Sequence, residues 1–183
     1  MQQRNYQREM DALIASLDAR PRLLLHSCCG PCSSACLERL APHFDIDVFF
    51  YNPNILPAEE WEKRLFWQKH LLETAPFGKN VGLIVPERDE TAFRLAAAGL
   101  ESEPEGGARC TECFVLRLSR TAEAAREGGY DYFATTLTVS PHKNAPLINA
   151  IGEKLAEDHG VLRSGGEGGE AGFTRHPRCQ VGR

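Results

Sequence analysis

Cysteines are the residues of this sequence whose spacing most clearly indicates chemistry. The chain has seven, and four of them fall within nine residues, in the stretch LLLHSCCGPCSSACLERL at 23–40. These four are Cys28, Cys29, Cys32 and Cys36, and a second Cys-x-x-Cys pair follows at Cys110 and Cys113. Both groups stand just ahead of predicted helices, and the loops after parallel strands gather at one end of an α/β sheet. Cys28 and Cys29 together with Cys110 and Cys113 could therefore place four thiolates around one centre, either zinc or iron–sulfur.

A redox dithiol is the main alternative use of the first group. Cys29-Gly-Pro-Cys32 repeats the four letters of a thioredoxin-type motif and opens a predicted helix, whose N-terminus lowers a thiol pKa. A thioredoxin-like oxidoreductase, however, has no use for Cys28 or for the second pair, which disfavours this interpretation. Cys36 lies one helical turn after Cys32 and is expected to pack in the core, since free cysteines are often buried. For Cys32, local packing and a role near the centre both stay open.

Length and charge limit the classes of protein to which the chain can belong. A chain of 183 residues with a net charge of −4 and a pI near 5.9 is long enough for one domain with a sizeable core. No apolar stretch approaches the ~20 residues that span a bilayer, and the polar N-terminus lacks a signal-peptide pattern. We therefore expect a cytoplasmic protein with no membrane partner, in which clustered cysteines bind metal or do redox chemistry. The acidic balance argues against bulk nucleic-acid binding and leaves room for a local basic patch.

Strand and helix patterns alternate along the chain. Short apolar runs predict strands at 22–27, 45–54, 80–87 and 130–140. Helical periodicity predicts helices at 5–18, 32–43, 57–75, 90–100, 114–129 and 144–160, with a loop over 101–113. This order predicts an α/β fold with a mostly parallel sheet and helices on both faces. We expect a single α/β catalytic domain over 1–163 and, from its glycine-rich composition, a flexible tail over 164–183.

Four motifs, taken in order, resemble the epoxyqueuosine reductase QueH family over roughly residues 20–162. They are LLLHSCCGPCSSACLERL, FFYNPNILPAEEWEKR, LESEPEGGARCTECFVLRLSRTAEAA and YDYFATTLTVSPHKN. The resemblance implies a nucleotide-hydrolase-like α/β sandwich and an enzyme that removes the epoxide oxygen of epoxyqueuosine at the wobble position of tRNA, giving queuosine. It implies a 4Fe–4S cluster on Cys28, Cys29, Cys110 and Cys113, and no cobalamin. It also suggests a second, mononuclear metal ion (iron) beside the cluster, and the enzyme needs an external electron donor.

Other polar residues of these motifs are candidates for contacts with substrate or tRNA, and no catalytic residue is assigned. They are Asn52, Asn54, Arg109, Arg117, His142 and Lys143. The competing interpretations are an ordinary turn for the asparagines, solvated loop charge for Arg109 and a salt bridge for Arg117. His142 and Lys143 follow the last predicted strand, where α/β proteins build their sites. His26, inside an apolar strand, is expected to be a core histidine.

The end of the chain and the loop after the first strand separate the remaining hypotheses. QueH members usually end in Tyr-Cys-Gly-Cys, whose cysteines form a redox-active disulfide, whereas this chain ends in RHPRCQVGR with Cys179 alone. The resemblance therefore implies that an internal dithiol relay is missing here. An ATP-pyrophosphatase-type nucleotide-binding enzyme would share the sheet, but its S-G-G-x-D-S loop is replaced by SCCGPCSS. A non-catalytic zinc module is the third hypothesis, and it would be colourless, unlike an iron–sulfur protein.

Overall fold

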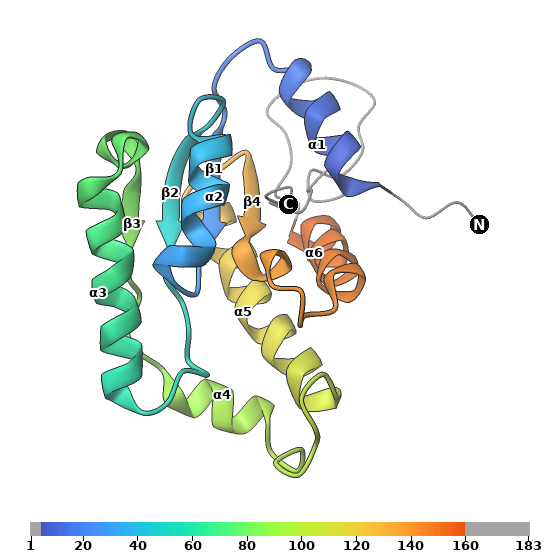
Figure 1. The fold of residues 1–183 in the computed structure, drawn as a ribbon. Helices are drawn as coiled ribbons and strands as arrows, with labels where there is room; N and C mark the ends of the chain where they lie inside the picture. The colour runs from blue at the N-terminus through green and yellow to red at the C-terminus, as the bar shows by residue number, and fades with distance from the viewer. Residues whose placement is uncertain (1–4, 160–183) are drawn as a thin grey trace.

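The four predicted strands form one parallel sheet in the computed structural model, which describes residues 5–159 (Figure 1). In chain order the strands are β1 (Arg22–His26), β2 (Asp45–Phe49), β3 (Gly82–Ile84) and β4 (Tyr132–Thr135). Their order across the sheet is β3-β2-β1-β4. The chain thus builds outward from β1 to β3 and then returns to place β4 on the other side of β1. Such a reversal leaves a crevice beyond the carboxyl ends of β1 and β4, where open α/β sheets bind their ligands.

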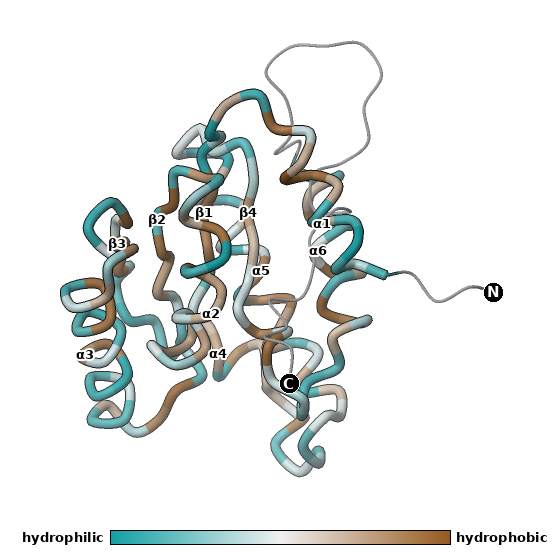
Figure 2. The backbone as a smooth tube through the Cα atoms, turned by 45° about the horizontal axis from the view of Figure 1, so that its top comes forward, coloured by the Kyte–Doolittle hydropathy of each residue, from teal (hydrophilic) through white to brown (hydrophobic). Residues whose placement is uncertain are grey.

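Helices cover both faces of this sheet. They are α1 (Tyr6–Ala15), α2 (Gly30–Leu40), α3 (Ala58–Thr74), α4 (Glu90–Ala96), α5 (Ala108–Glu127) and α6 (Ala145–His159), with 3-10 helices η1 (Pro76–Asn80) and η2 (Thr136–Val139). On β1, Leu23 and Leu25 join a buried cluster with α1 and α2, whereas Leu24 packs with α5 and α6. In Figure 1, α2 lies in front of the sheet and α5 behind it, and Figure 2 shows hydrophobic colour along the central strands. The predicted α/β class is confirmed.

Several element boundaries differ from the prediction, and two of these differences bear on the cysteine site. The last strand ends at Thr135, because the Thr135 hydroxyl accepts a hydrogen bond from the Leu137 N–H (3.1 Å) as the chain turns into η2. The helix predicted from 114 begins earlier, at Ala108, so the second cysteine pair lies on α5 and not in the loop before it. The Glu103 carboxylate accepts the Ala108 N–H (3.2 Å), one of the first-turn donors that find no partner inside a helix.

The membrane and tail expectations concern different parts of the chain. No helix within residues 5–159 combines the length and the apolar character needed to cross a bilayer. The tail predicted over 164–183, with Cys179, lies outside the described residues.

Candidate metal centre

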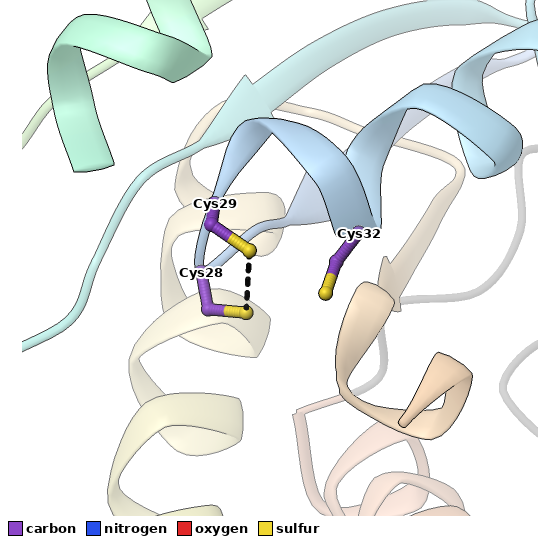
Figure 3. A group of neighbouring side chains, drawn as sticks. All are labelled: Cys28, Cys29 and Cys32. Carbon is purple, nitrogen blue, oxygen red and sulfur yellow. Dashed lines mark hydrogen bonds between the residues drawn. The ribbon is translucent and has the colours of Figure 1, made fainter. Parts of the chain in front are cut away.

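The turn after β1 brings three cysteine thiols together. Cys28 leaves the strand, Cys29 is the N-cap of α2, and Cys32 lies in the first turn of that helix. Their sulfur atoms all lie within 4.8 Å of one another, and the Cys28 and Cys29 sulfurs are 3.8 Å apart (Figure 3). This group could hold a metal ion, and soft sulfur ligands favour zinc or iron–sulfur centres. Of the two roles left open for Cys32, the structure favours the one near the centre.

Buried polar contacts hold this turn in shape. The Ser27 and Ser33 hydroxyls each donate to the side-chain oxygen of Gln68 on α3 (2.8 Å), and they also contact each other. A Cβ added to Gly30 would lie 2.7 Å from the Trp67 carbonyl oxygen, so α2 and α3 approach this closely only because residue 30 has no side chain. The first cysteines are therefore positioned by three packed elements, β1, α2 and α3.

The second cysteine pair shares a cavity with the first group. Cys28, Cys110 and Cys113 line one cavity of about 230 Å³. The Gly106 N–H donates to the Cys110 sulfur (3.3 Å) and so fixes the position of this side chain. Gly106 has a φ of 88°, which glycine adopts without the strain that a Cβ would cause. The chain thus brings together, at one cavity, cysteines from the two groups that the sequence paired.

Hydrogen bonding and burial set the protonation of these thiols. Hydrogen bonds from the Cys29 and Cys32 thiols lower the pKa of Cys28, and the charge of Arg117 acts in the same direction against desolvation. Burial raises the pKa of Cys113. Cys28 is therefore ionised more readily than Cys113.

Two residues expected in the core are found there. Cys36 is fully buried in the hydrophobic cluster beneath α1 and α2. His26 is also fully buried, with Nε2 donating to the Tyr51 carbonyl (3.0 Å) and Nδ1 2.9 Å from the Thr135 hydroxyl. Burial lowers the pKa of His26 to about 3, so the imidazole stays neutral. Both predictions are confirmed.

The other polar candidates from the sequence gather at the same end of the sheet. The cysteine cavity is lined in part by Asn54, Arg64, Arg117, His142 and Lys143. Arg109 lines a second cavity of about 600 Å³, which shares Asn54, Cys110 and Cys113 with the first. Asn52 is buried and contacts Arg117. Five of the six candidates thus line two adjoining cavities whose common wall carries the second cysteine pair, and Asn52 lies behind Arg117.

Comparison with known proteins agrees with the motifs. The profile of the family described as Epoxyqueuosine reductase QueH matches residues 23–163. A Staphylococcus epidermidis protein of that name is 43% identical over 164 residues, which cover 86% of this chain and 69% of the relative. A Streptococcus pyogenes relative of the same name is 40% identical, with 81% of this chain and 60% of the relative covered. One from Thermotoga maritima is 35% identical, with 76% and 70% covered. The chain belongs to the QueH family.

The match to QueH confirms both the family and the oxidoreductase class that the motifs predicted. The chain spans 60 to 70% of the length of these three relatives. The match runs from β1 to the end of α6 and so includes the whole cysteine site. The residues also fit the thiolate-bound cluster that the resemblance to QueH implies. They supply sulfur donors around one cavity, and the buried Nε of Arg117 has no partner within the part of the chain that the structure describes.

Two parts of this QueH site were not assigned from the sequence. Cys32 carried a usable signal, because it stands three residues after Cys29 and so lies on the same side of a helix. Gln68 carried none, since its partners Ser27 and Ser33 are 41 and 35 positions away.

Proposed function

We propose that this QueH chain is an epoxyqueuosine reductase that removes the epoxide oxygen of epoxyqueuosine at the wobble position of tRNA and yields queuosine. The observation that carries the proposal is the cavity shared by Cys28, Cys110 and Cys113, which opens beside cationic side chains. Cys28, Cys29, Cys110 and Cys113 hold a 4Fe–4S cluster in this proposal, and no cobalamin takes part. The N-terminal turns of α2 and α5 support it, since their N–H groups favour a negatively charged centre.

Cys32 is the competitor for a place among the ligands. Its sulfur lies within 4.8 Å of those of Cys28 and Cys29. Cys110 and Cys113, in contrast, are related to Cys28 only by lining the same cavity. A second, mononuclear iron ion beside the cluster is part of the same proposal, and Cys32 offers it a thiolate. Single substitutions separate these roles, because loss of a cluster ligand removes iron and sulfide together. Loss of a ligand to a mononuclear ion removes iron alone.

The reaction takes up two electrons and two protons. The two C–O bonds of the epoxide break, an alkene forms, and the oxygen leaves as water. The cluster, when bound, supplies electrons one at a time, and an external donor replaces them. We assign protonation of the leaving oxygen to His142 and Lys143, whose side chains line the cavity. Apolar walls from Phe114, Leu137 and Leu147 limit the access of bulk water to the reacting atoms.

The modified base enters, in this proposal, through the second cavity. Its volume of about 600 Å³ is in the usual range of small-molecule sites, and it meets the first cavity at Cys110 and Cys113. Leu56, Phe93 and Ala97 offer apolar surface for a flat base, and Arg109 offers charge for a phosphate. In a chain of net charge −4, such a local group of cations suits tRNA better than bulk attraction does. A cytoplasmic location follows from the tRNA substrate.

Anaerobic purification followed by a tRNA assay tests the proposal. We expect a brown protein with broad absorption at roughly 400 nm, with equal amounts of iron and sulfide from the cluster and a small excess of iron from the mononuclear ion. Incubation with epoxyqueuosine-containing tRNA and dithionite should convert the base to queuosine, detected by mass spectrometry of the digested tRNA. Cys113→Ser should remove iron and sulfide, and Cys36→Ala, in the core, serves as the matched control. A colourless protein that binds zinc and leaves the base unchanged would contradict the proposal.

A further inference from the structure

Arg117 is a buried cation without an acidic partner. It lies on α5 with 3% of its surface exposed and lines the cysteine cavity. Its Nη1 donates to the side-chain oxygens of Asn54 (2.9 Å) and, at the long limit of a hydrogen bond, Asn52 (3.4 Å). Its Nε is buried with no hydrogen-bond partner, and no carboxylate within residues 5–159 forms an ion pair with it. Buried arginines are normally paired, so this position calls for an anion.

The two asparagines hold the guanidinium in place without cancelling its charge. The Asn52 amide donates through Nδ2 to the Ser27 carbonyl (2.8 Å), which fixes the orientation of the amide and turns its oxygen toward Arg117. Ser27 is the residue directly before Cys28. The same contact therefore connects the arginine clamp, which consists of Arg117 with Asn52 and Asn54, to the cysteine turn. Both acceptors of the guanidinium are neutral. The positive charge of the Arg117 guanidinium is therefore not neutralised by its partners, although the side chain is buried.

Keeping such a charge buried is costly unless an anion enters the cavity. An unpaired buried ion carries a desolvation penalty that neutral hydrogen-bond partners offset only in part, and an opposite charge nearby offsets the rest. The acidic residue of the cavity wall, Glu105, forms no ion pair with Arg117 within the described chain. The remaining anions available to the cavity are thiolates, since Cys28, Cys110 and Cys113 line it together with Arg117. An RNA phosphate is a poor candidate, since almost none of the Arg117 side chain reaches the surface.

We propose that Arg117 is the built-in counter-charge of the metal–thiolate centre, a positioning residue held by Asn52 and Asn54 that acts through charge without touching substrate. A metal centre with four thiolate ligands carries net negative charge, and each electron added makes it more negative. A fixed positive charge therefore strengthens metal binding and favours the reduced state of the centre. The inference rests on the proposed function only in assuming that the four cysteines bind a metal.

Three variants separate charge from packing. Arg117→Lys keeps the charge, Arg117→Gln removes it, and Asn54→Asp leaves Arg117 in place but puts a carboxylate next to it in a side chain of nearly unchanged size. The midpoint potential of the reconstituted centre is measured by anaerobic titration followed by absorption and electron paramagnetic resonance. The affinity of the metal-free protein for Zn²⁺ is measured in parallel by competition with a chromophoric chelator. Thermal unfolding of the metal-free proteins shows that each variant is folded.

We expect Arg117→Gln and Asn54→Asp to lower the midpoint potential by at least about 59 mV, a tenfold change in a one-electron equilibrium. Their Zn²⁺ affinity should fall by roughly tenfold or more, and Arg117→Lys should stay close to the native protein in both measurements. Equal effects of the Lys and Gln variants, or a native potential in Asn54→Asp, would overturn the proposal and leave Arg117 a packing residue. The Zn²⁺ measurements distinguish a failure of this proposal from a failure of the proposed function. A protein that assembles no iron–sulfur cluster contradicts the proposed function, while its Zn²⁺ affinities still decide the role of Arg117.

Discussion

The side-chain oxygen of Gln68 accepts a 2.8 Å hydrogen bond from the hydroxyl of Ser27, although the two residues are 41 positions apart. Gln68 lies on α3, and Ser27 stands between the end of β1 and the first cysteine. The same oxygen accepts a second 2.8 Å bond from Ser33 on α2. One buried amide therefore joins three elements at the root of the cysteine turn, and the shape of that turn depends on a residue outside it.

Gln68→Met should destabilise the fold through this contact. The substitution keeps the volume and removes two buried hydrogen bonds, which costs about 1–3 kcal/mol of unfolding free energy. The two hydroxyls then have the Cys29 carbonyl oxygen as their remaining acceptor (3.3 and 3.0 Å). Urea denaturation of the metal-free protein measures the loss. Lys69→Met, next along the same helix and exposed, is the matched control and should stay within about 0.5 kcal/mol of the native protein. A Gln68 variant as stable as this control would show that the amide is dispensable.

Gly30→Ala tests the close approach of α2 and α3. The new methyl would lie 2.7 Å from the Trp67 carbonyl oxygen, a backbone atom that cannot rotate away. The helices must separate, at a cost of about 1–3 kcal/mol, despite the better helix propensity of alanine. Because Cys29 caps α2 at this point, we also expect lower metal content after reconstitution. Gly99→Ala is the comparison, since a Cβ there meets open space and only its φ of 78° is unfavourable. Native metal content in Gly30→Ala would contradict the prediction.

The second cavity should set the affinity for substrate. Phe93→Ala removes the aromatic surface of this cavity and should raise KM for epoxyqueuosine-containing tRNA roughly tenfold, the lower part of the range for lost base stacking. Iron content and kcat should change little, because Phe93 is not among the residues lining the cysteine cavity. Leu95→Ala, on the same helix and 74% exposed, should leave KM unchanged. Steady-state kinetics at several tRNA concentrations measures both. A loss of kcat with native KM would place the substrate elsewhere.

Alkaline pH should destabilise the protein through Tyr130. Burial and the hydrogen bond from its hydroxyl to Asp47 (2.6 Å) raise the pKa of Tyr130 to about 12. The folded state keeps this proton where an unfolded tyrosine, with a pKa of about 10, has lost it. This contribution is complete below pH ~10 and declines as pH rises from ~10 to ~12. Urea midpoints should therefore fall more steeply over this range in the native protein than in Tyr130→Phe. Parallel slopes would exclude Tyr130 as the source.

The fold could be predicted from the sequence because the patterns that indicate its strands and helices are local. Alternating apolar runs and helical periods predict the strands and helices, and a parallel sheet follows from their order. The start of α5 was misjudged for an equally local reason. Gly106 and Gly107 indicate a loop, but Gly107 is the N-cap, and Glu103 accepts the first free N–H of the helix from outside it.

The candidate site was only partly accessible, because its parts meet through the tertiary fold. The two cysteine pairs could be matched from their spacing and from the rule that loops gather at one end of a parallel sheet. The clamp around Arg117 could not, since Asn52 and Asn54 lie 65 and 63 positions away on another loop. The sequence offered Arg117 as a phosphate contact or a salt bridge. Its burial between two neutral amides favours neither.

The first cysteine pair follows β1, and the second lies on α5, in the connection through which the chain returns from β3 to β4. Cys29 and Cys110 are 81 positions apart. A metal bound by both pairs is therefore a cross-link that closes a loop containing α2, β2, α3, β3 and α4. Closing a loop of this size removes unfolded-state entropy worth about 4–5 kcal/mol in the chain-entropy treatment of such links. Metal loading would then be a late event in folding, complete only after α5 has docked on the sheet. Its loss would remove a constraint that spans nearly half of the chain.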